Sequence, residues 1–266
     1  MNHIRFVFLL IALSCLTAAH SLPGCPQTAP RQAAAGPVDT IGAGHTPLLT
    51  GQLRPGVRRY LIYIEDPKSP ASLWFWYWTR DIEEQTVGGE KAFSITQRWV
   101  GSDTAYYREV TSLNRASDFY PIYHAEKKRG QDWAYRWDKD QITGSDTVQD
   151  NAAKHFRLAF QEPNFNWNLD IETFEMLPLD SGKTFAINFY DAGLDPPAYV
   201  TYTVKGSETL WTPDGGGIDC WLLVTEGDNK GTHYSEMYWI AKQSHTFLKE
   251  VDHYGAVSRL KVRVQG

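Results

Sequence analysis

The sequence contains few cysteines and methionines, no excess of positive charge and no long apolar run beyond its first residues. Of 266 residues only 3 are Cys and 3 are Met, and 26 Lys and Arg face 31 Asp and Glu, for a net charge of −5. This balance argues against a generally basic nucleic-acid-binding protein. No later stretch reaches the roughly 18 uninterrupted apolar residues of a membrane-spanning helix, so we expect no transmembrane helix in the mature chain.

The local motifs of common catalytic and metal sites are also missing. The sequence has no Gly-x-Ser-x-Gly, no His-Glu-x-x-His and no Cys-x-x-Cys, which are the patterns of nucleophile elbows and zinc sites. Ser181–Thr184 ends like a phosphate-binding loop, but Leu177 stands where that loop requires a glycine. We therefore predict no catalytic residue, no metal site and no cofactor.

Residues 1–24 predict an export signal. Arg5 precedes the apolar run Phe6–Leu13, and small residues follow at Thr17–Ala19. A positive segment, a short apolar segment and small residues in this order are typical of a signal peptide. We therefore predict an exported protein that resides in the periplasm, is associated with the outer membrane, or is secreted.

The end of the signal has two alternatives, and the cysteines bear on the choice. Cleavage after the small-x-small segment Ala19–Ser21 would leave a soluble chain. Leu22–Cys25 instead resembles the lipobox of bacterial lipoproteins, in which Cys25 would be acylated and would anchor the chain to a membrane. Because exported proteins meet an oxidising compartment, Cys25 could otherwise form a disulfide with Cys220.

The rest of the chain divides into a leader and one domain. Residues 25–47 consist mostly of Pro, Ala, Gly, Gln and Thr, which cannot bury enough apolar surface to offset the entropy of ordering the backbone. We predict a flexible leader or tether over residues 25–47 and a single β domain over residues 48–266.

Aromatic residues and turns predict the fold of that domain. The sequence has 10 Trp, 14 Tyr and 12 Phe, and such side chains favour strands. About a dozen short alternating segments are separated by turns rather than by helices, which predicts a mainly β fold: one large curved antiparallel meander, forming an open or half β-barrel. Trp167, Ile171, Phe174 and Leu177 recur at helical spacing, and predict one short amphipathic helix that plugs an open end or covers one face.

The strand predicted at residues 73–78 carries aromatic side chains on both faces, with Trp74, Trp76 and Trp78 on one of them. Such a strand is expected to be covered on both sides or to line a cavity. We predict that the three tryptophans, with Trp167 and Phe174 of the helix, bind an acyl chain or another apolar small molecule. Burying each methylene group contributes about 0.8 kcal/mol and requires no polar partner. The alternative is that the tryptophans form only core.

The second half of the chain resembles a known family. The segments that carry the resemblance are Gly182–Asp191, Tyr199–Gly206, Cys220–Glu226, Glu236–Lys242 and Phe247–Glu250. They are similar to an uncharacterised family of bacterial exported proteins, domain of unknown function 3108. The resemblance implies a half-barrel like that of the periplasmic lipoprotein carriers and their outer-membrane receptor. In that fold a concave apolar face, partly closed by a short helix, holds acyl chains, and no catalytic residues come with it.

Two other functions stay open. Loop carboxylates could serve a secreted polysaccharide-active hydrolase, whose two carboxyl groups lie roughly 5 to 9 Å apart; the pairs are Glu83 with Glu84, Asp191 with Asp195, and Asp214 with Asp219. The chain could also be a structural component of envelope assembly that binds envelope proteins along an exposed sheet edge. We favour the non-enzymatic protein that binds an apolar ligand.

Overall fold

The computed structural model describes residues 36–42, 44–70, 74–101 and 107–264. All strands in these ranges belong to one sheet, and two 3-10 turns and one α-helix accompany it. The elements are β1 (Val38–Ile41), η1 (Thr50–Gln52), β2 (Gly56–Glu65), β3 (Trp74–Val87), β4 (Glu90–Gly101), β5 (Arg108–Arg115), β6 (Pro121–Lys128), β7 (Gln131–Trp137), β8 (Gln141–Gly144), β9 (Arg157–Ala159), β10 (Phe165–Asn166), η3 (Trp167–Leu169), α1 (Asp170–Glu175), β11 (Thr184–Tyr190), β12 (Ala198–Trp211), β13 (Gly217–Asn229), β14 (Thr232–Ala241), β15 (Phe247–Tyr254) and β16 (Val257–Val264).

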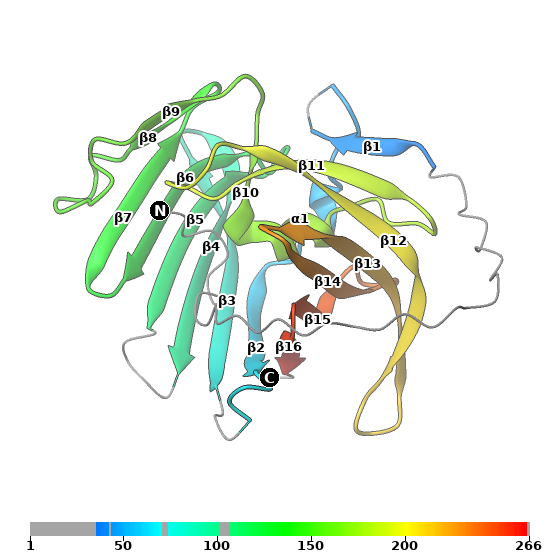
Figure 1. Ribbon diagram of the computed structural model, residues 1–266. Coiled ribbons are helices and arrows are strands. Elements are labelled where there is room, and N and C mark those ends of the chain that lie inside the picture. The colour runs from blue at the N-terminus through cyan, green and yellow to red at the C-terminus, as the bar shows by residue number, and fades with distance from the viewer. Residues whose placement is uncertain (1–35, 43, 71–73, 102–106, 265–266) are drawn as a thin grey trace.

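The sheet consists of two meanders joined at their inner strands. Strands β2 to β9 follow one another to one edge, strands β11 to β16 form the other half, and β16 pairs with β2 in the middle. The outer edges are the short strands β9 and β1, so the sheet curves without closing (Figure 1). This confirms the predicted mainly β, open meander. One detail differs, because β1 and β10 each pair with β11 in parallel.

The segment between the two halves crosses the concave face of the sheet. After β9 the chain must return to β11, near the opposite edge, and it does so through β10, η3 and α1 (Figure 1). Asn166 caps this turn, since its side-chain oxygen accepts a hydrogen bond from the Asn168 backbone N–H at 3.0 Å. The predicted helix is therefore present, over Asp170–Glu175.

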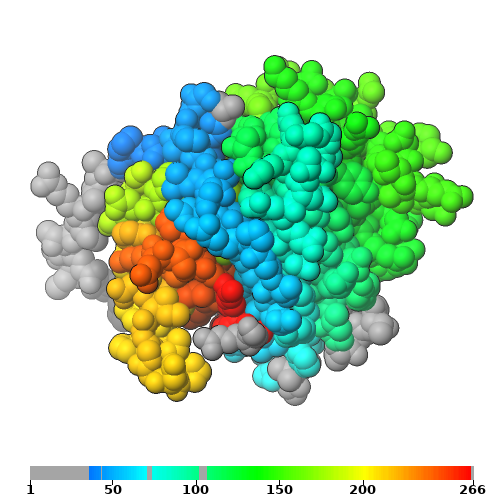
Figure 2. Space-filling view, turned by 180° about the vertical axis from the view of Figure 1, so that it is seen from behind, coloured from blue at the N-terminus to red at the C-terminus, as the bar shows by residue number. Residues whose placement is uncertain are grey.

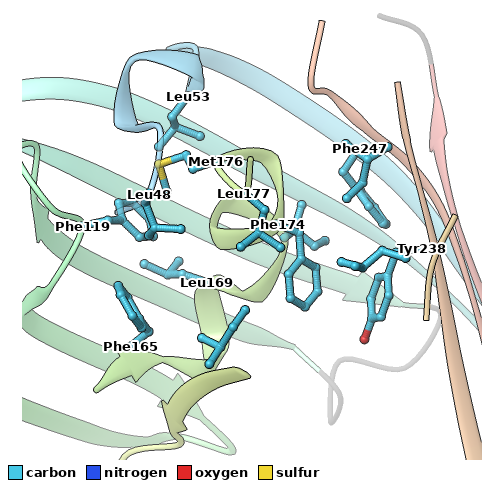
Figure 3. Close-up of a cluster of buried hydrophobic side chains, with 14 of the residues drawn as sticks. Leu48, Leu53, Phe119, Phe165, Leu169, Phe174, Met176, Leu177, Tyr238 and Phe247 are labelled. Atoms are coloured by element: carbon cyan, nitrogen blue, oxygen red, sulfur yellow. The ribbon is translucent and has the colours of Figure 1, made fainter. Parts of the chain in front are cut away.

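The apolar side chains of this crossing segment fill the curve of the sheet. Figure 3 shows Leu169, Phe174, Met176 and Leu177 between the two halves, and all four are fully buried. They belong to one core cluster with residues from both meanders, among them Phe119, Tyr238 and Phe247. A second, smaller cluster on β7 and β8 contains Tyr135, Trp137 and Ile142.

Part of the predicted leader belongs to the sheet. Val38–Ile41 forms β1 beside β11, and Ile41 is buried in the main core. The predicted boundary of the flexible leader, residue 47, is therefore too late in the sequence. Backbone pairing with β11 orders Val38–Ile41 despite the low apolar content of this stretch. The predicted signal and Cys25 lie outside the described residues. Within the described ranges, no helix combines the length and apolar character needed to cross a bilayer.

Candidate functional site

Strand β3 places its tryptophans on the concave face. Successive side chains of a strand point to opposite faces, and here Trp78 and Ile82 are buried beneath α1, while Phe75 and Tyr77 are exposed on the outer face. Both faces of this strand are thus aromatic near its start, as the sequence predicts. Among the described residues, the chain covers the concave face at Trp78 and Ile82 but leaves Trp74 exposed at the start of the strand.

The five predicted ligand-binding residues lie in very different surroundings. Trp78 and Phe174 are members of the main core cluster, and Trp76 and Trp167 are half-buried against it. Trp74, one step further along the same face of β3, is exposed. The structure therefore brings most of the predicted residues together, but they pack against the protein's own side chains. Of the three tryptophans on the concave face of β3, Trp74 and Trp76 keep accessible surface.

The ring faces of Trp78 are occupied by neighbouring residues. Trp99 stacks on it with ring centroids 5.0 Å apart and planes 19° from parallel. The Arg80 guanidinium lies 4.4 Å and the Lys261 ammonium 4.8 Å from the centre of the Trp78 ring. Cations over an indole face are attracted by its quadrupole, more strongly where water is excluded. Trp78 therefore holds buried cations in place.

Acidic residues of α1 bind these interior cations. Arg80 Nη2 donates to Glu172 Oε2 at 2.5 Å, and both side chains are fully buried. Arg58 forms a second buried ion pair with Glu175. Burial raises the pKa of Glu172 to about 6, even though Arg80 favours its charged form. The helix is thus fixed to the concave face by ion pairs as well as by apolar packing.

A further set of charged side chains lies inside β15 and β16. Arg259 Nη2 donates to Glu250 Oε1 at 2.7 Å, and Lys261 forms a buried ion pair with the same carboxylate. Burial disfavours the charged form of Glu250, but Lys261 and Arg259 outweigh it and lower its pKa to about 2. Asp252 pairs with Arg259, and burial raises the pKa of this carboxyl group.

Sequence reasoning missed this interior charge, although a signal was present. The segments Glu250–Asp252 and Arg259–Lys261 alternate charged and apolar residues. This alternation identifies the two faces of each strand but not which face is inside. The usual assignment puts charge toward solvent. Here the charges face inward, because strand partners and α1 supply opposite charges.

A buried serine and histidine lie together in the other half of the interior. Ser112 Oγ and His124 Nδ1 are 3.0 Å apart, and Asn166 Nδ2 lies 3.1 Å from the same ring nitrogen. All three side chains are buried, and burial lowers the pKa of His124 to about 4. A hydrolytic serine needs access to substrate and a histidine oriented by its other nitrogen. This arrangement is a structural hydrogen-bond network.

Three of the six carboxylates named for a hydrolase accept hydrogen bonds from nearby side chains. Asp191 accepts from Asn168 Nδ2 at 2.9 Å, and Asp219 accepts from Thr209 Oγ1 at 2.8 Å across the β12–β13 pair. Asp214 accepts from Thr212 within the turn that joins these strands. Within the described ranges no group of three His, Cys, Asp or Glu side chains has metal-binding geometry.

A polar hollow lies away from the tryptophans, on β7, β8 and the loop that follows. Its volume is about 470 Å³, and its lining includes Arg136, Asp138, Lys154 and Arg157. Charged walls of this kind do not suit an acyl chain, since they offer little apolar surface to bury. The aromatic end of β3 therefore remains the candidate site for an apolar ligand.

Cys220 is buried with a free thiol, and burial raises its pKa to about 11.

Comparison with known proteins supports the fold. The structure is similar to a beta-barrel-like protein of domain of unknown function DUF1849 from Brucella abortus, with a TM-score of 0.54 and 12% identity over 79% of this chain and 96% of that one. It also matches the hypothetical lipoprotein YmcC from Escherichia coli K12, with 11% identity over 79% and 87% of the two chains, but the TM-score is only 0.32. At such identities the likeness extends to the fold alone.

No curated protein sequence matches this chain significantly. The model of the family described as protein of unknown function (DUF3108) matches residues 71–262, which include β3 and nearly the whole of the sheet. This confirms the resemblance carried by the motifs of the second half. The chain belongs to the DUF3108 family of proteins of unknown function.

Proposed function

We propose that the protein is a non-enzymatic, exported component of the cell envelope that binds an acyl chain or a similar apolar ligand at the aromatic end of β3. The observation that carries the proposal is the accessibility of Trp74, which is 45% exposed beside the half-buried Trp76 on the same, concave face of β3. Soluble monomers seldom leave contiguous apolar surface of this kind without a partner. The export signal predicted at residues 1–24 supports the location.

The concave side of this end offers the ligand surface. Trp74 and Trp76 alternate with the outward-facing Phe75 and continue the row that ends in the buried Trp78. A ligand that lies on Trp74 and Trp76 would thus extend the existing core rather than replace it. An acyl chain suits such a surface because each buried methylene group contributes about 0.8 kcal/mol without a polar partner.

This site is smaller than the hollow predicted from the sequence. Phe174 and Trp78 already pack within the protein's own core, so they do not line the site. We therefore expect binding that depends on Trp74 more than on any residue of α1.

Uptake of a fluorescent fatty acid tests the proposal. Trp74→Ala should weaken uptake about tenfold, as expected when one exposed aromatic contact is lost. The matched control is Trp211→Ala, which removes an exposed tryptophan at the far end of β12 and should leave uptake unchanged. Absence of uptake by the unaltered protein, or equal losses in both variants, would refute the proposal.

A further inference from the structure

The outer face of the sheet carries a continuous apolar surface on four neighbouring strands. Val262 of β16 pairs directly with Leu61 of β2, Leu61 with Tyr77 of β3, and Tyr77 with Val100 of β4. These four side chains are 36 to 50% exposed. With strands about 4.8 Å apart, the row spans about 14 Å.

A second row lies beside the first on the same face. Tyr63 of β2 pairs with Phe75 of β3, each two residues from its neighbour in the first row. We call these six residues the outer belt: Leu61, Tyr63, Phe75, Tyr77, Val100 and Val262. Figure 2 shows β2 (blue) and β3 (cyan) side by side at the molecular surface, seen from the side opposite to α1.

The polarity of β15 and β16 shows that the belt is part of a wider pattern. Glu250 and Lys261 face inward and are buried, whereas their neighbours Val251, Leu260 and Val262 face outward and keep accessible surface. Burying charges costs free energy that only good pairing offsets. An arrangement with charges inside and apolar side chains outside is typical of strands whose outer face meets lipid.

Cations border the belt. Lys249 pairs with Val262 at one end of the first row, and Arg59 precedes Leu61 by two residues on the same face. Arg98 on this surface pairs with Glu109, whereas neither Lys249 nor Arg59 forms an ion pair with a described residue. The Lys249 ammonium lies over the Trp239 ring, 4.3 Å from its centre. On a chain with a net charge of −5, positive charge beside an apolar surface provides partners for anionic headgroups.

The curvature favours a deformable partner. The belt lies on the convex side of the sheet, so two copies could meet there only along a narrow strip. A lipid surface conforms to a convex face, and tyrosines with apolar rings and polar hydroxyls suit its headgroup region.

We propose that the outer belt docks on the surface of a phospholipid bilayer that contains anionic lipids, with Lys249 and Arg59 at the headgroups. The belt lies on the opposite face of β3 from Trp74 and Trp76, so this docking is separate from the acyl-binding site proposed above. Docking there would hold the concave face away from the membrane plane and leave its aromatic end free.

Vesicle co-sedimentation of the exported chain tests the proposal. Cys25→Ser is introduced throughout, so that no acyl group can be attached to this residue. We expect binding to vesicles of phosphatidylethanolamine and phosphatidylglycerol, an about tenfold loss in Leu61→Ser/Tyr77→Ser, and no loss in the exposed control Trp211→Ser. Arg59→Gln/Lys249→Gln should weaken binding to these vesicles but not to phosphatidylcholine alone.

Three results would overturn the proposal: no binding by the parent chain, full binding by Leu61→Ser/Tyr77→Ser, or an equal loss in Trp211→Ser. A parent dimer that becomes monomeric in Leu61→Ser/Tyr77→Ser, seen by light scattering, would also overturn it by assigning the belt to a second copy. Fatty-acid uptake should be unchanged in Leu61→Ser/Tyr77→Ser. This measurement separates a failure of the membrane-docking proposal from a failure of the proposed acyl-binding site.

A labelling experiment covers the case in which the double substitution prevents folding. A polarity-sensitive dye is attached to Leu61→Cys, and to Trp211→Cys as the control; the native Cys220 is buried. Vesicles should shift the emission of the first label to shorter wavelength and leave the second unchanged. Identical responses from the two labels would refute docking through the belt.

Discussion

Phe174 provides the sharpest test of whether the curve of the sheet is filled by core or by a removable lid. The ring is fully buried, with its centroid 4.7 Å from that of Tyr202 and 4.8 Å from that of Tyr238. Replacing a buried phenylalanine by alanine costs about 3 to 5 kcal/mol, including the cavity left behind. We therefore expect Phe174→Ala to lower the free energy of unfolding by about 4 kcal/mol.

For a domain of this size each kcal/mol changes the melting temperature by about 2 to 4 °C. The melting temperature of Phe174→Ala should thus fall by about 8 to 16 °C, and the urea midpoint should fall with it. Far-UV circular dichroism and tryptophan fluorescence measure both. Trp211→Ala is the control and should change stability by less than about 0.5 kcal/mol, because the side chain is 76% exposed.

One result would refute this reasoning. If Phe174→Ala cost less than about 1 kcal/mol and increased the uptake of a fluorescent fatty acid, α1 would be a displaceable lid. The interior would then be the ligand site, and the aromatic end of β3 only its entrance. A large loss of stability without a gain in uptake would place Phe174 in the permanent core.

Two further predictions concern the ion pair that binds α1 to the sheet. Arg80→Met should lower the free energy of unfolding by about 3 to 5 kcal/mol, because Glu172 would lose the cation beside its buried carboxylate. The double variant Arg80→Met/Glu172→Leu should recover most of this loss, and urea unfolding measures both. A double variant no more stable than Arg80→Met would contradict the argument. The pKa of Glu172 is raised by burial from 4.5 to about 6, so the stability that its protonated form contributes is present below pH 4.5 and is lost as the pH rises through about 6. This loss in the free energy of unfolding amounts to about 2 kcal/mol. Glu172→Gln should therefore lose less stability than the parent between about pH 4.5 and 7. Superimposable plots of stability against pH for the two proteins would contradict the raised pKa of Glu172.

The fold was predictable because its signals are local. Alternation along each strand and turns rich in Gly, Asn and Asp specify strands and short connections without reference to distant residues. The helix was predictable for the same reason, since Ile171 and Phe174 recur at helical spacing. β1 was missed because four residues form it only through pairing with β11, which lies more than 140 residues away in the sequence.

The site was only partly predictable, because it depends on where the crossing segment lies. The alternation along β3 identifies two aromatic faces. Whether Trp78 is buried and Trp74 exposed depends on how much of the concave face the crossing segment covers. Sequence alone gives no measure of that cover. The prediction of an apolar hollow therefore assigned to a ligand the space that Phe174 and its neighbours occupy.

The charges inside β15 and β16 connect these findings. They pair with one another across the two strands, Glu250 with Lys261 and Arg259, and Asp252 with Arg259, so this part of an otherwise apolar interior is held by specific ion pairs. Buried ion pairs add little net stability compared with apolar residues of similar volume, and a sheet with apolar residues inside and charges outside would satisfy the requirements of folding more simply. The inverted arrangement is therefore better explained by the surroundings of the outer face. On this reasoning the six residues of the outer belt, and not the covered hollow, are where a partner should first be sought.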